Sequence, residues 1–463
     1  MRVCGTAHPA APAHRVECYL VKRALVLLVV GIMLASSGDA AQAGSRNRRR
    51  PRPVTLVWHA ETITGDPVES QHGDEPINPA SVVKVATSLW ALDRLGPSFR
   101  YETRFYARGT VDRDHRALLG DLVVVGAGDP DFHAENAFLV AQALNELDVD
   151  RVTGALIVSK KFWIGWENGS EGRNPDPTQR ALLMATRLRQ ALDPKRWNGP
   201  TRAAWREFAE RRSLSAAHPP HVAVTGGVGT DGDTSQGQML VVHRSQPLSE
   251  ILRRFNCYSN NDIERVAAGL GSVDELADMV ATRCAVPREE VQLETASGLG
   301  SNRLTPRIIV RLLREFRATC DRLNVPVQSL LPVAGCDPGT VTRFFPLLSA
   351  DPNATSVIGK TGTLTSTDGG VAVLAGYART SHGDYVFCVA VPKAAGRIKG
   401  ARHAEEKWVV DFLDQNGGGQ PHTCAPPLPG PDAGASIILL GDRVLPPPGE
   451  ASVPPQQPAV ADN

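Results

Sequence analysis

Three apolar segments in the C-terminal half of the chain are spaced like the strands of a sheet. They cover residues 357–364, 370–378 and 385–391, and the short gaps between them suit hairpin turns. Residues 403–415 follow with an amphipathic helical pattern. The pattern predicts an antiparallel sheet with a helix covering one of its faces.

Near the N-terminal end of the folded region, the pattern predicts a β-hairpin that leads into a helix. A strand at 54–58 precedes a polar turn at 61–66, and a second short strand follows. The helix opens in the segment 78–92, because Pro79 suits a first helical position and Gly96 suits the end of the run. This helix carries the most informative residues of the chain.

The sequence pattern of residues 97–240 differs from that of the flanking segments and predicts an inserted, partly irregular domain. The expected elements are strands at 99–105, 121–125 and 154–159 and a helix at 135–147. A long polar stretch with scattered tryptophans lies between Trp163 and Trp205. The glycines at 126–130 do not indicate a nucleotide-binding loop, because only two are in place and Asp-Pro follows where a helix should begin.

Helical patterns return after residue 240, so that the chain divides into a discontinuous domain and an insertion. The helices are expected from residue 248 through 255, from about 263, and over 306–317. We therefore expect residues 53–96 and 241–415 to form one domain around the insertion at 97–240. Residues 416–463 are rich in Pro and Gly and are predicted to be a largely disordered tail, interrupted only at 436–444.

The overall charge and the first 52 residues bear on where the protein works. The chain of 463 residues has 50 Lys+Arg against 49 Asp+Glu, a balance that does not suggest binding to nucleic acid. Lys22-Arg23, the apolar run 24–35 and small residues up to Ala43 predict a secretory signal with a long leader over 1–43. A basic linker, 44–52, follows it. We expect export to the periplasm or cell-wall space, with an uncleaved N-terminal anchor as the alternative.

Export also permits disulfides among the cysteines that follow the signal. Six remain after it, namely Cys257, Cys284, Cys320, Cys336, Cys388 and Cys424. Their spacings match no metal motif, and the pairing cannot be deduced from the sequence. One or two bridges are expected, and buried reduced thiols are the alternative reading.

Candidate chemistry begins with Ser81 and Lys84. Ser81 is expected in the first helical turn, where unpaired N–H groups stabilise developing negative charge. Lys84 follows at i+3, so its side chain lies about 5–6 Å away on the same face. It can take the serine proton only when neutral, which requires a pKa lowered by about 3 units through burial and a nearby positive charge. A lone Ser-x-x-Lys is weak evidence, since an exposed helix face gives the same pattern.

Two further motifs follow in order, Ser259-Asn260-Asn261 and Lys360-Thr361-Gly362, and the second lies on a predicted strand. With Ser81-x-x-Lys84 they resemble the motif set of the serine penicillin-recognising enzymes. The flanking segments that narrow the resemblance are Asn78–Ser81, Gly126–Pro130, Ser245–Leu248, Ser297–Leu299 and Leu331–Gly335. They are similar to the class C low-molecular-mass penicillin-binding proteins, the D-alanyl-D-alanine carboxypeptidase/endopeptidases of the penicillin-binding protein 4 type.

The resemblance implies an α/β multidomain protein with a serine β-lactamase/transpeptidase-like domain. That domain has an antiparallel sheet covered by helices plus an all-α part, and an inserted domain lies between the first and second motifs. The implied catalytic residues are Ser81, Lys84 and Ser259, with Asn261, Lys360, Thr361, Gly362 and Thr363 as substrate-binding residues. The implied oxyanion hole is formed by the N–H groups of Ser81 and Thr363. Peptidoglycan stem peptides are the implied substrates, β-lactams the covalent inhibitors, and no cofactor or metal is implied.

Three alternatives remain open. The middle motif has Asn260 where the family more often has Asp, and Tyr258-Ser259-Asn260 also fits the Tyr-x-Asn of class C β-lactamases. The Ser-Asn-Asn frame is preferred, because the segment Ser245–Leu248 precedes it at the spacing of the carboxypeptidase family. A β-lactamase or esterase on the same scaffold would differ in its deacylation rate, and a non-catalytic peptidoglycan-binding protein would have no use for Lys84. A Ser-His-Asp triad and metal catalysis are disfavoured, because no histidine lies in a triad context and no His-Glu-x-x-His is present.

Overall fold

A computed structural model describes residues 55–167, 169, 174–231, 237–439 and 444–445. The predicted signal and the basic linker lie outside the described residues. Among the helices of the described part, none is both long and apolar enough to cross a membrane.

The first structural unit is a five-stranded antiparallel sheet with the strand order β10-β11-β12-β1-β2. Its strands are β1 (Val57–Thr62), β2 (Pro67–Gln71), β10 (Val357–Leu364), β11 (Val371–Thr380) and β12 (Gly383–Pro392). The predicted hairpin and the predicted three-stranded sheet are therefore joined, because β1 pairs with β12. Strand β10 lies at one edge of this sheet.

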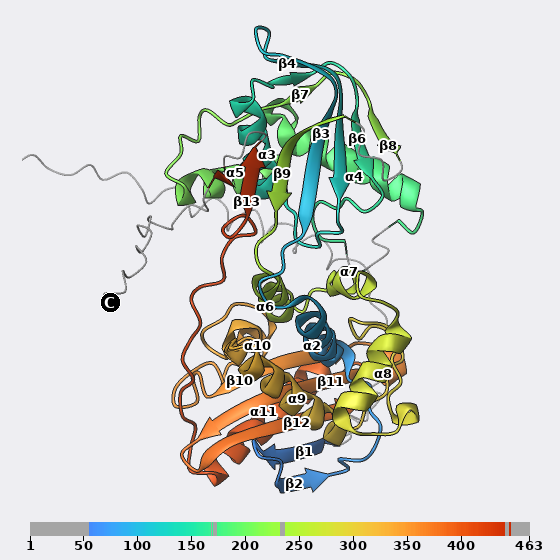
Figure 1. Cartoon of the computed structure of the whole chain (residues 1–463). Coiled ribbons are helices and arrows are strands. Elements are labelled where there is room, and N and C mark those ends of the chain that lie inside the picture. The colour runs from blue at the N-terminus through green and yellow to red at the C-terminus, as the bar shows by residue number, and fades with distance from the viewer. Residues whose placement is uncertain (1–54, 168, 170–173, 232–236, 440–443, 446–463) are drawn as a thin grey trace, which may run out of the picture. The chain divides into compact units, whose positions relative to one another are not determined.

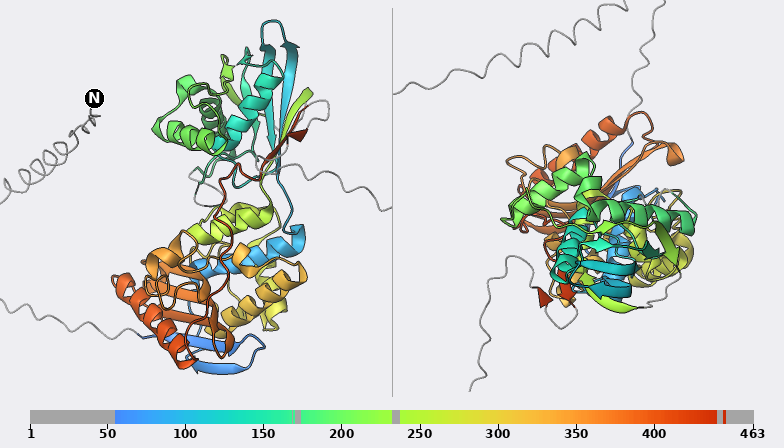
Figure 2. Two further views of the ribbon diagram at one scale, coloured as in Figure 1. Left: turned by 90° about the vertical axis from the view of Figure 1, so that its left-hand side faces the viewer. Right: turned by 90° about the horizontal axis from the view of Figure 1, so that it is seen from above.

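Helices cover both faces of the sheet, as the left view of Figure 2 shows. Alternate residues of β11 point to opposite faces. Val373 and Tyr377 pack into the core of the large helical layer, whereas Leu374 packs with Trp408 and Phe412 of the covering helix α11 (Ile398–Gln415). The helical layer consists of α2 (Val83–Leu95), α6 (Leu248–Tyr258), α7 (Ile263–Ala268), α8 (Val273–Cys284) and α9 (Pro306–Arg322).

Short helical turns complete this part of the chain. They are η1 (Ala80–Val82), η3 (Arg288–Glu290), η4 (Val327–Ser329), α10 (Thr340–Phe344) and η5 (Thr367–Gly369).

The inserted segment builds a second sheet with its own core. The strand order is β14-β13-β9-β3-β4-β5-β7, with β6 paired to β4 and β8. The chain enters through β3 and leaves through β9, which pair directly so that Glu102 lies opposite Arg244. The strands are β3 (Glu102–Asp112), β4 (Ala117–Gly126), β5 (Arg151–Val152), β6 (Leu156–Ser159), β7 (Ala223–Val224), β8 (Val228–Asp231) and β9 (Gln238–Arg244).

The polar stretch between Trp163 and Trp205, for which no element was predicted, contains helices. The helices of the insertion are α3 (Ala134–Glu146), α4 (Pro177–Leu192), η2 (Pro194–Arg196) and α5 (Gly199–Arg211). Asp176 caps α4 by accepting bonds from two backbone N–H groups, and Asn198 caps α5. Each helix buries only a narrow apolar stripe, such as Met184 and Leu188, so its polar composition concealed it.

The tail is also more ordered than predicted over the residues that the structure describes. The strand β13 (Ser436–Leu439) pairs with β9 of the insertion, and Figure 1 shows the two strands side by side. The strand β14 (Val444–Leu445) pairs with β13. A disulfide joins Cys424 to Cys336. The structure describes 416–435 as ordered chain, held by the disulfide at Cys424, where disorder was predicted. Strand β13 falls within 436–444, the part of the tail that was expected to interrupt the disorder. The other cysteines described, Cys257, Cys284, Cys320 and Cys388, are buried thiols.

Candidate active site

Ser81 lies in a tight turn just before the helix that carries Lys84. The sequence placed Ser81 within the first turn of the helix, but the α-helix begins at Val83 and Ser81 occupies the 3₁₀ turn η1. Ala80 has a left-handed backbone with φ of 47°, which interrupts regular helix geometry. Its N–H donates to Asn78 Oδ1 at 3.0 Å, so the uncommon conformation is held by a specific bond.

Lys84 is fully buried, and its Nζ contacts three oxygen atoms. Nζ lies 2.8 Å from Ser81 Oγ, 2.9 Å from Asn261 Oδ1 and 2.6 Å from the Ser297 carbonyl oxygen. Burial, followed by the charge of Lys360, lowers the pKa of Lys84 well below its usual value. A neutral amine has two N–H donors and one lone pair. The amide and carbonyl oxygens take the donors, and the lone pair is left for the hydroxyl of Ser81.

Ser259 lies beside the second buried lysine. Ser259 ends helix α6 in a left-handed conformation, with φ of 55° and ψ of 41°, and this directs its side chain toward strand β10. Lys360 Nζ donates to Ser259 Oγ at 2.9 Å and to the Thr361 carbonyl oxygen at 2.9 Å. Burial lowers the pKa of Lys360 to about 7. The two lysines therefore each face a serine hydroxyl in an environment that disfavours their charged forms.

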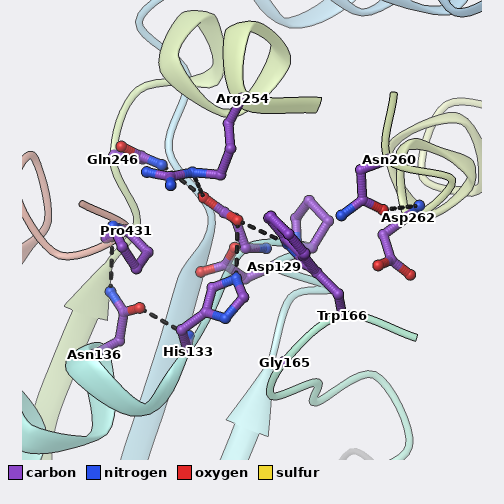
Figure 3. A network of polar contacts seen from close by, with 12 residues as sticks. Asp129, His133, Asn136, Gly165, Trp166, Gln246, Arg254, Asn260, Asp262 and Pro431 are labelled. Atoms are coloured by element: carbon purple, nitrogen blue, oxygen red, sulfur yellow. Dashed lines mark hydrogen bonds and ion pairs between the residues drawn. The ribbon is translucent and has the colours of Figure 1, made fainter. Parts of the chain in front are cut away.

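The geometry favours the Ser-Asn-Asn frame of the middle motif over the Tyr-x-Asn frame. Asn261 contacts Lys84, whereas the Oδ1 atom of Asn260 accepts a bond from the Asp262 N–H at 2.7 Å, as Figure 3 shows. Asp262 in turn accepts the N–H of Glu167, at 3.0 Å and 2.9 Å to its two oxygens, which ties the motif to the insertion. Asn260 is thus a turn-forming residue, and Asn261 is the one that reaches the lysine.

Strand β10 passes close to the serine turn, and Gly362 makes this approach possible. A Cβ atom on Gly362 would lie 2.6 Å from the Pro79 carbonyl oxygen and 3.3 Å from the Ser81 nitrogen. A side chain at this position would therefore push the strand and the turn apart. We assign Gly362 a steric role in the site.

The backbone of β10 also presents donors to the site. Gly359 N donates to the Pro332 carbonyl oxygen on the side of β10 that faces away from β11. Backbone groups alternate in direction along a strand, so the N–H groups of Thr361 and Thr363 point to that same side. The N–H of Thr363 is therefore available at the sheet edge.

Three contacts at the site were not anticipated from the sequence. The Ser297 carbonyl accepts from Lys84. Thr340 Oγ1 lies 2.7 Å from Thr361 Oγ1. Arg402 Nη2 donates to Thr363 Oγ1 at 3.0 Å. Ser297 stands in a segment that supported the family resemblance, but a carbonyl contact has no sequence signal, and neither Thr340 nor Arg402 belongs to a motif that the resemblance used.

The described residues contain no group of three or more His, Cys, Asp or Glu side chains placed to hold a metal ion. The site places a serine hydroxyl next to an amine of lowered pKa.

Comparison with known proteins agrees with the arrangement of the motifs. The family model of the D-Ala-D-Ala carboxypeptidase 3 (S13) family matches residues 55–180 and 210–410. Carboxypeptidase Rv3627c of Mycobacterium tuberculosis is 25% identical over 345 residues, which is 68% of this chain and 71% of the relative.

Solved structures of other bacterial proteins share the fold. The Bd0816 predatory endopeptidase of Bdellovibrio bacteriovorus has a TM-score of 0.70 and 20% identity, over 82% of this chain and 100% of the other. Penicillin-binding protein 4 of Haemophilus influenzae, in complex with a β-lactam, has a TM-score of 0.55 and 17% identity, over 78% of this chain and 97% of the other.

Proposed function

The chain belongs to the D-Ala-D-Ala carboxypeptidase 3 (S13) family and is a serine-type D-Ala-D-Ala peptidase, and from that premise we propose that Ser81 is its nucleophile and Lys84 its general base. Ser81 Oγ attacks the carbonyl carbon of the penultimate D-alanine. The terminal D-alanine leaves as the free amine, and water later hydrolyses the acyl-enzyme. The 2.8 Å contact between Lys84 Nζ and Ser81 Oγ carries this proposal, because it joins the nucleophile to a buried amine with a lowered pKa.

The proton follows the hydrogen bonds. As Ser81 Oγ bonds to the carbonyl carbon, its proton passes to the lone pair of Lys84 Nζ. The nitrogen of the leaving amino acid must then receive a proton when the amide bond breaks. Ser259 Oγ, held by Lys360 Nζ at 2.9 Å, is the hydroxyl assigned to that relay. Asn261 fixes Lys84 through its Oδ1 atom, and its amide nitrogen is assigned to the substrate amide.

The negative charge on the carbonyl oxygen is stabilised by backbone donors. The N–H of Ser81 lies in the turn η1, and the N–H of Thr363 points out from the edge of β10. Together they are the proposed oxyanion hole. One such donor typically changes the rate by about 10²–10³-fold.

The proposed substrates are peptidoglycan stem peptides that end in D-Ala-D-Ala, with cross-links between stems as a second substrate. The endopeptidase activity named for the Bdellovibrio relative supports the second, and the carboxypeptidase name of the family supports the first. We further propose that β-lactams acylate Ser81, as the β-lactam complex of the Haemophilus protein suggests. The predicted signal at 1–43 agrees with a site of action outside the cytoplasm.

Intact-mass measurement after incubation with benzylpenicillin tests the nucleophile. The parent protein is expected to gain one drug mass, and Ser81→Ala is expected to gain none. Ser70→Ala, which removes an exposed serine of β2, is the matched control and should be acylated like the parent.

Other outcomes would point elsewhere. Drug consumption without a stable adduct would favour a β-lactamase. An intact drug and an unmodified protein would favour a peptidoglycan-binding protein without turnover.

A further inference from the structure

Arg402 of helix α11 reaches the edge of the site and is held there from two sides. Its Nη2 donates to Thr363 Oγ1 at 3.0 Å. Its guanidinium carbon lies 3.5 Å from the centre of the Phe344 ring. Stacking on an aromatic face and a fixed hydrogen bond orient the planar guanidinium before any ligand arrives. The side chain is only partly buried, so a remaining face is open to solvent.

No acidic side chain in the described part of the chain forms an ion pair with Arg402. Glu405, one turn along the same helix, is fully buried, and neither of its oxygens is in a hydrogen bond. Burial raises the pKa of Glu405 well above its usual value, and the charge of Arg402 lowers it in part. Arg343, whose guanidinium carbon lies 5.5 Å from the same Phe344 ring, adds further positive charge. Arg402 is therefore fixed at the edge of the site by Thr363 and Phe344, and no described carboxylate is hydrogen-bonded to it.

The two lysines of the motifs, Lys84 and Lys360, are poorly suited to bind a carboxylate through a fixed positive charge. Lys84 contacts Ser81, Asn261 and Ser297, and Lys360 donates to Ser259 and to Thr361. Their burial also favours their neutral forms, with the pKa of Lys360 at about 7. An arginine keeps its charge at any pH at which proteins are handled.

We propose that Arg402 recognises the C-terminal carboxylate of the leaving amino acid and thereby selects substrates with a free carboxyl end. This rests on the proposed peptidase function. Thr363 is the link between the two roles, since its N–H is assigned to the oxyanion and its hydroxyl accepts from Arg402. A carboxylate placed at this hydroxyl meets a guanidinium with several N–H donors, which bind carboxylates in pairs. Arg402 is thus a specificity residue for the substrate terminus, while Lys84 remains free to be neutral.

The test compares two forms of one peptide, diacetyl-L-Lys-D-Ala-D-Ala with a free carboxylate and the same peptide with a C-terminal amide. The parent enzyme is expected to prefer the free acid. Arg402→Gln is expected to lose about 10- to 100-fold in kcat/KM on the acid and little on the amide, since a charge-assisted hydrogen bond is lost only with the acid. Arg402→Lys should restore part of the preference, because it keeps the charge and loses the planar fork.

Lys399→Gln is the matched control. It removes one positive charge from the exposed side of the same helix and should behave like the parent. If Arg402→Gln keeps the parent's preference for the acid, or if Lys399→Gln loses it equally, the assignment of Arg402 is wrong.

A binding measurement separates this inference from the peptidase proposal. N-acetyl-D-alanine and its amide are titrated calorimetrically into the parent and into Arg402→Gln. If neither peptide is hydrolysed but the acid binds better only when Arg402 is present, the carboxylate site stands and the proposed reaction fails. If the peptides are hydrolysed and the acid binds equally to both proteins, the reaction stands and the role of Arg402 fails.

Discussion

The active site and the junction between the insertion and the helical layer bury charged groups in opposite ways. Lys84 and Lys360 are fully buried and contact only neutral oxygen atoms. At the junction, Asp131 is also buried, but its carboxylate is surrounded by hydrogen-bond donors and positively charged groups. Arg254 Nε lies 3.0 Å away, and Gln246 Nε2 donates at 2.6 Å, as Figure 3 shows for these two side chains.

The direction of each pKa follows from these partners. Burial would raise the pKa of Asp131, but the hydrogen bond and charge of His133 and the charge of Arg254 lower it below its usual value. Burial lowers the pKa of Lys84, and the charge of Lys360 lowers it further. A buried charge with opposite partners holds two parts of a protein together. A buried amine without them becomes neutral and can act as a base.

Removing the Lys84 amine is expected to have the largest effect on the active site. Lys84→Met is expected to slow acylation by benzylpenicillin by about 10³–10⁴-fold, or about 4–5 kcal/mol in the activation barrier. The melting temperature should not fall, because a buried amine is replaced by an apolar chain of similar length. The time course of adduct formation by intact mass measures the rate. A rate within tenfold of the parent would show that Lys84 is not the base.

Removing a charge at the junction should affect stability and not chemistry. Asp131→Asn is expected to lower the free energy of unfolding by about 3–5 kcal/mol, since it leaves the buried Arg254 without its carboxylate. Acylation of the folded variant should stay near the parent rate. Chemical denaturation and adduct formation measure the two effects.

Asp129 provides a matched control two residues away. One of its oxygens is buried without a hydrogen-bond partner, and burial raises its pKa to about 7. Between pH 4 and 7 the folded state therefore binds more protons at Asp129 than the unfolded state, and this contribution to stability falls as pH rises. Asp129→Asn should be stabilising above pH 7 and neutral near pH 4. If Asp129→Asn lowers the free energy of unfolding as much as Asp131→Asn does, the contrast between a buried carboxylate with charged partners and one without them is wrong.

A smaller effect is expected when Lys360 is replaced and stability is measured instead of activity. Its pKa is about 7 in the folded state and about 10.5 when unfolded, so the unfolded state binds more protons between these values. Stability from this group therefore rises with pH across that window. Lys360→Met should stabilise the protein by about 1–4 kcal/mol at pH 7, and the gain should shrink toward pH 10. A gain that does not vary with pH would contradict the lowered pKa.

Much of the fold could be read from hydrophobic spacing, and the failures have specific causes. The strands β10 to β12 and the helices α6 and α9 are long or apolar enough to show their pattern. Helices α4 and α5 were missed because their caps are short signals within polar sequence. The strand β13 is four residues long in a Pro- and Gly-rich tail, and only its pairing with β9 makes it a strand.

The motifs identified the candidate site, but they did not predict several contacts within it. The spacing from Ser245–Leu248 favoured the Ser-Asn-Asn frame, and the contact between Asn261 and Lys84, which lie 177 positions apart, agrees with that frame. Gly362 was predicted to bind substrate, and the structure adds that strand β10 and the serine turn approach each other closely at this glycine. Arg402 lies in an amphipathic helix, where a polar residue carries no signal of its own.

The sequence by itself determined which reactive groups this protein has and their order along the chain. Ser81 and Lys84 are only three residues apart, so their proximity does not depend on how the rest of the chain folds. Only the tertiary structure decided their charge states, because a pKa depends on burial and on neighbours brought from distant segments. It also decided which arginine reaches the edge of the site, since Arg402 meets Thr363 only when α11 packs against the sheet.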